Sequence, residues 1–329
     1  MVPQYDEPLE QLRVRQPTAA EPSDLDDFWA DTLAQSRAVW WEPMARPIDA
    51  GIPVIEIFDV AFAGFGGEPI RAWYRRPAGV SEDLPVVIQY PGYGGGRALP
   101  HQVHPWVLAG YAELVIDVRG QGGLHGWVGD TADSSVSGPT TPGFMTRGIE
   151  DPANLYLRRL LTDGVLAVDA ARQLPGVDGS NVVLSGTSQG AGLALGTAAL
   201  EPNVAAVMAN VPFLCDFPRS VALASEGPYL EIAMFLASHR WRVESTFATL
   251  AYVDMALLAS RATAPAYFSV ALADTTCPPS GVFAAYNSYR GAKEISVYPY
   301  NNHEGGQFHQ EAVQLAWLPK VLAARSSDA

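Results

Sequence analysis

One serine in this chain stands in a setting that could make it a nucleophile. It is Ser188, which lies between Gly186 and Gly190 in the stretch GTSQG, at the end of the apolar run NVVLS. A serine hydroxyl attacks a carbonyl when a base takes its proton and when it projects clear of the backbone. A sharp turn from strand to helix provides this projection, and glycines two positions to either side make room for the turn. The pattern therefore predicts a catalytic serine; a plain glycine-rich turn with a capping serine is the alternative.

A base and an orienting acid should follow such a serine, each in a loop after a later strand. Asp274 follows the strand-like run AYFSVAL, and His303 follows the next such run, EISVYPY. The order serine, acid, histidine predicts that these residues form a catalytic triad with Ser188. Asp216 and Asp254 are poorer candidates for the acid because neither directly follows a convincing strand.

Two backbone N–H groups are needed to stabilise the oxyanion that forms when the serine attacks. The helix that begins after the serine offers the N–H of Gln189, and the glycine-rich loop QYPGYGGGRALPH offers that of Tyr93. The competing interpretation of this loop is a phosphate cradle. It is disfavoured because no Lys-Ser/Thr follows and no dinucleotide fingerprint fits.

A zinc hydrolase is a further alternative, with His101, His104 and His125 as possible ligands. The chain lacks a His-Glu-x-x-His helix and a cysteine cluster, so we expect neither a metal nor another cofactor. We expect the two cysteines, Cys215 and Cys277, to be buried, reduced thiols.

Short apolar runs alternate with helical patterns along the chain, which is typical of a mostly parallel sheet with helices on both faces. The runs that we expect to form eight strands are residues 52–64, 70–76, 85–90, 111–118, 181–186, 204–211, 266–272 and 294–300. The first two alternate well enough to form an antiparallel pair at the edge of the sheet. Helical patterns occupy residues 106–109, 156–173, 188–200 and 311–324.

The sequence predicts one domain over residues 1–329. Residues 1–50 should form a helical extension, in which Ser23 caps a helix that begins with acidic residues. Residues 213–262 are too long for an ordinary crossover, so we expect them to form a helical cap over the carboxyl edge of the sheet.

The charge of the chain limits its partners. Its 329 residues include 21 basic and 35 acidic side chains, which give a formal net charge of −14, and 48% of the residues are hydrophobic. Nucleic acid and anionic membranes are therefore poor partners. The first residues carry acids where a signal peptide would be basic, and no run is long enough to span a membrane. These features predict a cytoplasmic protein.

Three motifs in order, DVRGQGG at 117–123, GTSQG at 186–190 and HEGG at 303–306, resemble the signature of a known family. It is the acetyl xylan esterase and cephalosporin C deacetylase family, carbohydrate esterase family seven. The stretches DEPLEQL, GFMTRGIEDP, NVPFLCDF and CPPSGVFAAYNSY extend the resemblance over nearly the whole chain. It implies an α/β-hydrolase fold for the parallel sheet and helical cap.

The resemblance also implies an activity: removal of acetyl groups from acetylated sugars and cephalosporin C-type esters through a Ser-His-Asp acyl-enzyme mechanism. The resemblance assigns Ser188, Asp274 and His303 as the triad and the N–H groups of Tyr93 and Gln189 as the oxyanion donors. These are the residues that the local sequence context also indicates. The resemblance further implies small ester substrates, no cofactor, and a homo-oligomer, a hexamer whose sites face an interior cavity.

Further roles follow from matched positions. Arg119 would tie its loop to the body of the protein, and Glu304 would anchor the loop of the histidine. Trp127, Phe213 and Pro228 match apolar positions near the family's pocket, although each could equally belong to the core.

The chain also departs from the family pattern. Pro91 stands where the family usually has histidine before Gly-Tyr, and this leaves the acyl selectivity open. A carboxylesterase of broader specificity for small acyl or aryl esters is the alternative function. A peptidase or lipase would share the triad, whereas a binding protein on this fold would be expected to have lost part of it.

Overall fold

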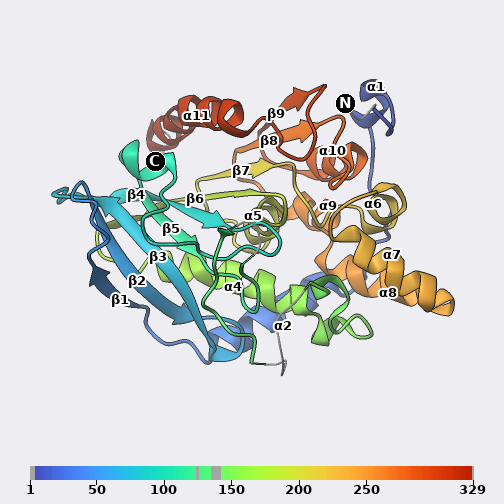
Figure 1. Ribbon diagram of the computed structural model, residues 1–329, viewed down its shortest axis with the longest axis horizontal. Helices are drawn as coiled ribbons and strands as arrows, with labels where there is room; N and C mark the ends of the chain where they lie inside the picture. Colours follow the sequence, from blue (N-terminus) through green and yellow to red (C-terminus); the bar gives the residue numbers. More distant parts are fainter. Residues whose placement is uncertain (1–3, 124–125, 135–141, 328–329) are drawn as a thin grey trace.

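The sheet that runs through the molecule has nine strands (Figure 1). The computed structural model describes residues 4–123, 126–134 and 142–327. The strands are β1 (Met44–Ile48), β2 (Ile55–Ala63), β3 (Pro69–Pro77), β4 (Leu84–Tyr90), β5 (Ala112–Ile116), β6 (Val177–Thr187), β7 (Ala206–Asn210), β8 (Ala266–Ala271) and β9 (Lys293–Tyr298). Their order is β1-β2-β3-β5-β4-β6-β7-β8-β9. The pairs β1–β2, β2–β3 and β3–β5 are antiparallel, and the other neighbouring pairs are parallel.

The sheet has one strand more than the eight expected. The additional strand is β1, which lies within the segment 1–50 that was expected to be a helical extension, so that expectation is wrong for this part. Its sequence MARPI is almost wholly exposed and contains Pro47, as an edge strand can. An exposed edge strand has no alternation of buried and exposed residues, and the sequence therefore gave no signal for it.

Helices cover both faces of the parallel part. On one face lie α4 (Tyr156–Ala171) and α5 (Gln189–Leu200), and on the other α3 (Pro105–Leu108) and α11 (Gln307–Ser327). The helix α10 (Pro279–Ser288) joins β8 to β9. In the part of the chain that the structure describes, no helix combines the length and the apolar character that a membrane span requires.

A helical insertion lies between β7 and β8, where the cap was expected. It contains α6 (Phe217–Leu223), α7 (Tyr229–Ser238), α8 (Val243–Leu250) and α9 (Met255–Leu258), and α7 and α8 project at one side of the molecule (Figure 1). Asp254 holds the insertion together from inside. Its buried carboxylate accepts hydrogen bonds from the N–H groups of Asp216, Phe217 and Ala256 at 2.8–2.9 Å.

The N-terminal segment contributes α1 (Leu9–Leu12) and α2 (Leu25–Arg37). The residue that caps α2 is Asp24, whose side chain makes no capping hydrogen bond, so the expected cap at Ser23 is wrong. Trp29 fixes this helix instead, because its indole is buried and donates to the carbonyl of Tyr252 in the insertion at 2.8 Å.

Candidate active site

Ser188 occupies a sharp turn between β6 and α5. Its backbone has φ 58° and ψ −121°, a strained conformation for a residue with a side chain. Three hydrogen bonds hold it there: its N–H donates to the carbonyl of Asn210 at 2.9 Å, and its carbonyl accepts from the N–H groups of Gly192 and Phe213, each at 3.0 Å. Hydrogen bonds to β7 and α5 therefore keep Ser188 in this strained conformation.

The two glycines that flank Ser188 are required by close backbone contacts. A Cβ at Gly190 would lie 1.9 Å from the carbonyl oxygen of Tyr90. A Cβ at Gly186 would lie 2.3 Å from the carbonyl carbon of Gly190. Backbone atoms cannot move aside as a flexible side chain can, so only glycine fits at either position.

The structure brings Ser188, His303 and Asp274 together from three loops. The Nε2 atom of His303 lies 3.0 Å from the Oγ of Ser188, and its Nδ1 lies 2.9 Å from Oδ2 of Asp274. Asp274 is fully buried, and its other oxygen accepts from the N–H groups of Thr276 and Cys277, each at 2.8 Å. The carboxylate is thus fixed in orientation as well as in position.

The loop that carries His303 is held by its neighbours. The side-chain oxygen of Asn302 accepts from the N–H groups of His303 at 2.9 Å and of Thr275 at 3.0 Å. The carboxylate of Glu304 accepts from the N–H of Asn302 at 3.0 Å and from the amide of Asn301 at 2.6 Å. Glu304 anchors the loop, as the resemblance implied, whereas the role of Asn302 was missed.

The backbone N–H groups of Tyr93 and Gln189 make no hydrogen bond to any residue that the structure describes. Gln121, which the sequence analysis missed as an individual residue, ties their two loops together. It accepts from the N–H of Gly94 at 2.6 Å and donates to the side-chain oxygen of Gln189 at 3.1 Å. Its amide also donates to the hydroxyl of Tyr156 at 2.9 Å.

The side chain of Tyr93 is tied to the helical insertion. Its hydroxyl donates to Glu231 on α7, and the same carboxylate accepts from the N–H groups of Gly143 and Met145, each at 3.0 Å. Burial and the neighbouring carboxylate of Glu231 raise the pKa of the Tyr93 phenol above its usual range. The phenol therefore stays protonated and remains a donor.

Arg119 anchors its loop to α4, in the way that the resemblance implied. The buried guanidinium makes two hydrogen bonds to Asp163, at 2.5 and 2.7 Å, and one to Glu68 at 2.7 Å. Burial disfavours its charged form, but Asp163 and Glu68 outweigh that effect and hold the pKa of Arg119 above its usual value.

Among the described residues, the histidines of the zinc alternative do not form a cluster. His101 is exposed, the Nδ1 of His104 lies 2.9 Å from a carboxylate oxygen of Glu113, and His125 lies outside the described residues. Among the residues that the structure does describe, one set of His, Cys, Asp and Glu side chains is close enough to share an ion: Asp274, His303 and Cys277.

Both cysteines are free and buried, as expected. Cys277 lies beside the Asp274–His303 pair. Burial, with the nearby Asp274, raises the pKa of its thiol well above the usual value. A neutral thiol is a poor metal ligand, because metals bind the thiolate.

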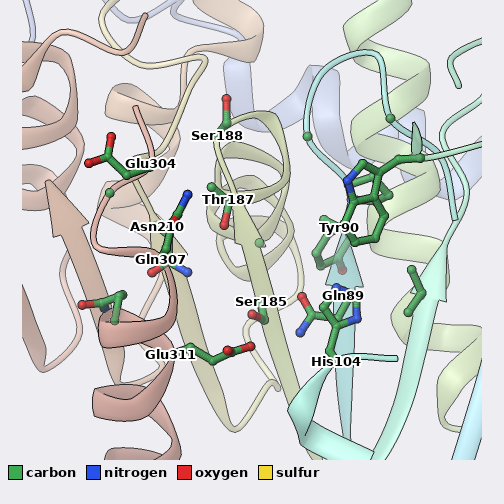
Figure 2. A pocket seen from close by; sticks show the side chains of 18 of the residues that line it. Gln89, Tyr90, His104, Ser185, Thr187, Ser188, Asn210, Glu304, Gln307 and Glu311 are labelled. Carbon is green, nitrogen blue, oxygen red and sulfur yellow. The ribbon is translucent and has the colours of Figure 1, made fainter. Parts of the chain in front are cut away.

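A cavity of about 530 Å³ opens beside Ser188 (Figure 2). Its lining includes Gln89, Pro91, Tyr93, Trp127, Ser185 and Glu311. Of the three predicted pocket residues, Trp127 lines this cavity but Phe213 and Pro228 do not. Phe213 is fully buried, with its ring centroid 4.3 Å from that of Tyr229, so it belongs to the core.

Comparisons with known proteins agree with this geometry. The family model described as Acetyl xylan esterase (AXE1) matches residues 2–321. The acetyl esterase Axe7A of Xylanibacter ruminicola is 27% identical over 321 residues, which are 93% of this chain and 69% of that protein.

Solved structures show the same likeness. An acetyl xylan esterase from Paenibacillus sp. R4 is 37% identical with a TM-score of 0.87, covering 95% of this chain and 99% of that one. Acetyl xylan esterase 1 from Thermoanaerobacterium sp. JW/SL YS485 is 33% identical with a TM-score of 0.86 and the same coverage. An acylaminoacyl peptidase from Pyrococcus horikoshii, 15% identical with a TM-score of 0.56 over 81% of this chain and 41% of that one, shares the fold alone. The match over residues 2–321, together with these two esterase structures, shows that the chain belongs to the acetyl xylan esterase family and is a carboxylic ester hydrolase of the α/β-hydrolase fold.

Proposed function

We propose that this enzyme removes acetyl groups from acetylated xylan fragments and related sugars, with Ser188, His303 and Asp274 as its triad. The observation that carries the proposal is the pair of contacts made by the histidine. One ring nitrogen lies 3.0 Å from the serine hydroxyl and the other 2.9 Å from the buried carboxylate.

The mechanism follows from these contacts. His303 accepts the hydroxyl proton of Ser188 through Nε2 while the serine oxygen attacks the ester carbonyl. Asp274 accepts the Nδ1 proton, which fixes the tautomer and stabilises the imidazolium. The imidazolium then gives its proton to the departing alcohol, and water repeats the cycle on the acetyl-enzyme, releasing acetate.

The oxyanion would be held by the N–H groups of Tyr93 and Gln189. Gln189 follows Ser188 in the chain, Tyr93 lines the cavity beside Ser188, and neither N–H has an acceptor among the described residues. Backbone donors that the fold holds in place need no reorganisation when charge develops, and losing one such donor typically costs about a hundred- to a thousandfold in rate.

The acyl selectivity belongs to the same proposal. We expect acetyl to be preferred and cephalosporin C-type acetyl esters to be accepted, because family resemblance implies both. Pro91, in place of the usual histidine, lines the cavity beside the serine. This substitution favours one second candidate, a carboxylesterase that accepts longer acyl or aryl esters.

The oligomeric state and location rest on the family resemblance and on the residues. We propose a cytoplasmic homo-hexamer; two free cysteines fit a reducing compartment. Light scattering after size-exclusion chromatography tests the assembly, and fractionation of the native cells tests the location.

The activity is tested with 4-nitrophenyl esters from acetyl to octanoyl, acetylated xylo-oligosaccharides and 7-aminocephalosporanic acid. The variant Ser188→Ala should abolish all of these activities, while Ser260→Ala, at a serine in the insertion that bonds a local carbonyl, should keep them. A preference for acetyl supports the deacetylase. A preference for longer chains favours the broader carboxylesterase, and full activity of Ser188→Ala would refute the nucleophile assignment.

A further inference from the structure

The sheet face between α3 and α11 changes from apolar to polar along its strands. Toward the middle of β4, β6 and β7 it carries Val87, Val183 and Met208, which belong to an apolar cluster with side chains of α11. Two residues further along β4 and β6, the same face carries Gln89 and Ser185, which lie opposite each other in the register. The polar part of the face forms a wall of the cavity beside Ser188.

These two polar side chains are buried at the wall of the cavity. Gln89 is 9% exposed and Ser185 is 4% exposed, yet neither side chain makes a hydrogen bond within the described part of the chain. Figure 2 shows both beside the cavity, with His104 close to Gln89 and the carboxylate of Glu311 directed toward Ser185. Because both residues line the cavity, water or a ligand bound there can complete the hydrogen bonds of their polar atoms.

Helix α11 adds further polar groups along the same cavity. Gln314 donates to the side-chain oxygen of Asn210 at 2.8 Å, and both residues line the cavity. Gln310 is 1% exposed; its oxygen accepts from Tyr298 at 2.9 Å, but its amide nitrogen has no partner among the described residues.

The chemistry of the lining selects the kind of ligand. Amide and hydroxyl side chains offer donors and acceptors side by side, which suits sugar hydroxyls because each of these both donates and accepts. An alkyl chain would leave the buried groups unpaired, which is costly. Glu304 and Glu311 line the cavity, and no cationic side chain of the described residues contacts them, so the lining favours an uncharged ligand over an anionic one.

Aromatic rings complete the lining. Phe308 is 80% exposed and Trp127 is 37% exposed, and both border the cavity. An exposed ring offers an apolar face against which the C–H face of a sugar ring can pack.

We propose that this cavity binds the uncharged, hydroxyl-bearing alcohol half of the ester, a carbohydrate, through Gln89, Ser185 and Glu311. The inference rests on the proposed function, and it adds where the sugar lies and which residues recognise it. The cavity of about 530 Å³ is large enough for more than one sugar ring.

The test compares two substrates and one inhibitor. Monoacetylated xylobiose carries the sugar, 4-nitrophenyl acetate lacks it, and unacetylated xylobiose should compete with 4-nitrophenyl acetate. The variants are Ser185→Ala and Glu311→Gln; the latter is on the partly exposed side of α11 and should not disturb folding. The matched control is Ser269→Ala, a fully buried serine of β8 that does not line the cavity.

We expect each cavity variant to raise the KM for acetylated xylobiose and the inhibition constant of xylobiose about three- to tenfold, the loss of one hydrogen bond. The kcat/KM for 4-nitrophenyl acetate should stay within about twofold, and Ser269→Ala should change neither substrate.

Other results overturn the inference in distinguishable ways. If the enzyme deacetylates xylobiose but the cavity variants behave like the control, the sugar lies elsewhere and the proposed function stands. If the variants lower activity on both substrates equally, the residues are structural. If 4-nitrophenyl acetate is cleaved while acetylated xylobiose is not and xylobiose does not inhibit, the proposed function itself fails.

Discussion

The hydroxyl of Tyr93 donates a hydrogen bond to the carboxylate of Glu231, which joins the loop after β4 to helix α7 of the insertion. The same carboxylate accepts from the N–H groups of Gly143 and Met145. One acidic side chain therefore connects three segments that are far apart in the sequence, next to a backbone N–H that we propose as an oxyanion donor.

Removing this carboxylate should impair catalysis more than substrate binding. We expect Glu231→Ala to lower kcat for 4-nitrophenyl acetate about tenfold or more, because a displaced oxyanion donor loses much of its effect. The KM should change less than about threefold, since the cavity lining stays in place. Steady-state kinetics check this against Glu244→Ala, an exposed glutamate on α8 of the same insertion. An unchanged kcat in Glu231→Ala would show that Tyr93 needs no support from the insertion.

Gly190 should tolerate no side chain. The Cβ of Gly190→Ala would lie 1.9 Å from the carbonyl oxygen of Tyr90, so β4 and α5 would have to separate. We expect a loss of about 2 kcal/mol or more in the free energy of unfolding, with most of the esterase activity lost. The control is Gly179→Ala in β6, where the nearest atom would be a side-chain carbon of Arg172 at 3.4 Å. Urea denaturation should separate the two variants, and equal midpoints would contradict the steric argument.

Replacing Arg119 by lysine should lower the stability of the fold far more than replacing Arg261 by lysine. Arg119 is fully buried and makes a two-pronged contact with Asp163, which a lysine cannot reproduce, so Arg119→Lys should destabilise the fold by about 3 kcal/mol. Arg261 pairs with Glu21 and Asp26 at the surface, where such pairs contribute about 0–1 kcal/mol. Thermal unfolding of both variants measures the contrast, and a similar loss in the two would contradict it.

Local sequence context was enough to predict that the side chains of Ser188, Asp274 and His303 come together. Ser188 stands in a short glycine-flanked turn, and Asp274 and His303 each follow an apolar strand. In a parallel sheet the carboxyl ends of strands meet at one edge, so loops distant in sequence converge there. The parallel strands were predicted for the same reason, since strands buried on both faces are apolar throughout.

Residues that act through tertiary contacts could not be predicted in this way. Glu231 is an ordinary acidic residue in a helix, and its importance comes from three segments that meet only in the fold. Gln89 and Ser185 lie in apolar strands, and nothing in the sequence around them marks them as functional. The common role that we propose for them depends on the register, which places them opposite each other. Phe213 was expected near the pocket because it matches an apolar pocket position of the family, but its ring is fully buried in the core.

Asp254 should make the stability of the protein depend on pH. Its carboxyl is fully buried between the N-termini of α6 and α9. Burial, with a contribution from the nearby Asp216, raises its pKa to about 7, although three backbone N–H groups oppose the rise. The folded protein therefore binds a proton at this group more readily than the unfolded chain, in which an aspartate has a pKa of about 4.

The contribution of Asp254 to stability is therefore greatest at acidic pH. Stability contributed by the protonated carboxyl is complete below about pH 4 and is lost as the pH rises to about 7, with a slope of up to about 1.4 kcal/mol per pH unit. Asp254→Asn removes the titrating group, so its stability relative to the parent should be lower at pH 5 than at pH 8. Urea denaturation at several pH values measures the two curves. Parallel curves would mean that the carboxylate keeps its charge in the folded protein, with the three backbone N–H groups outweighing the cost of burial.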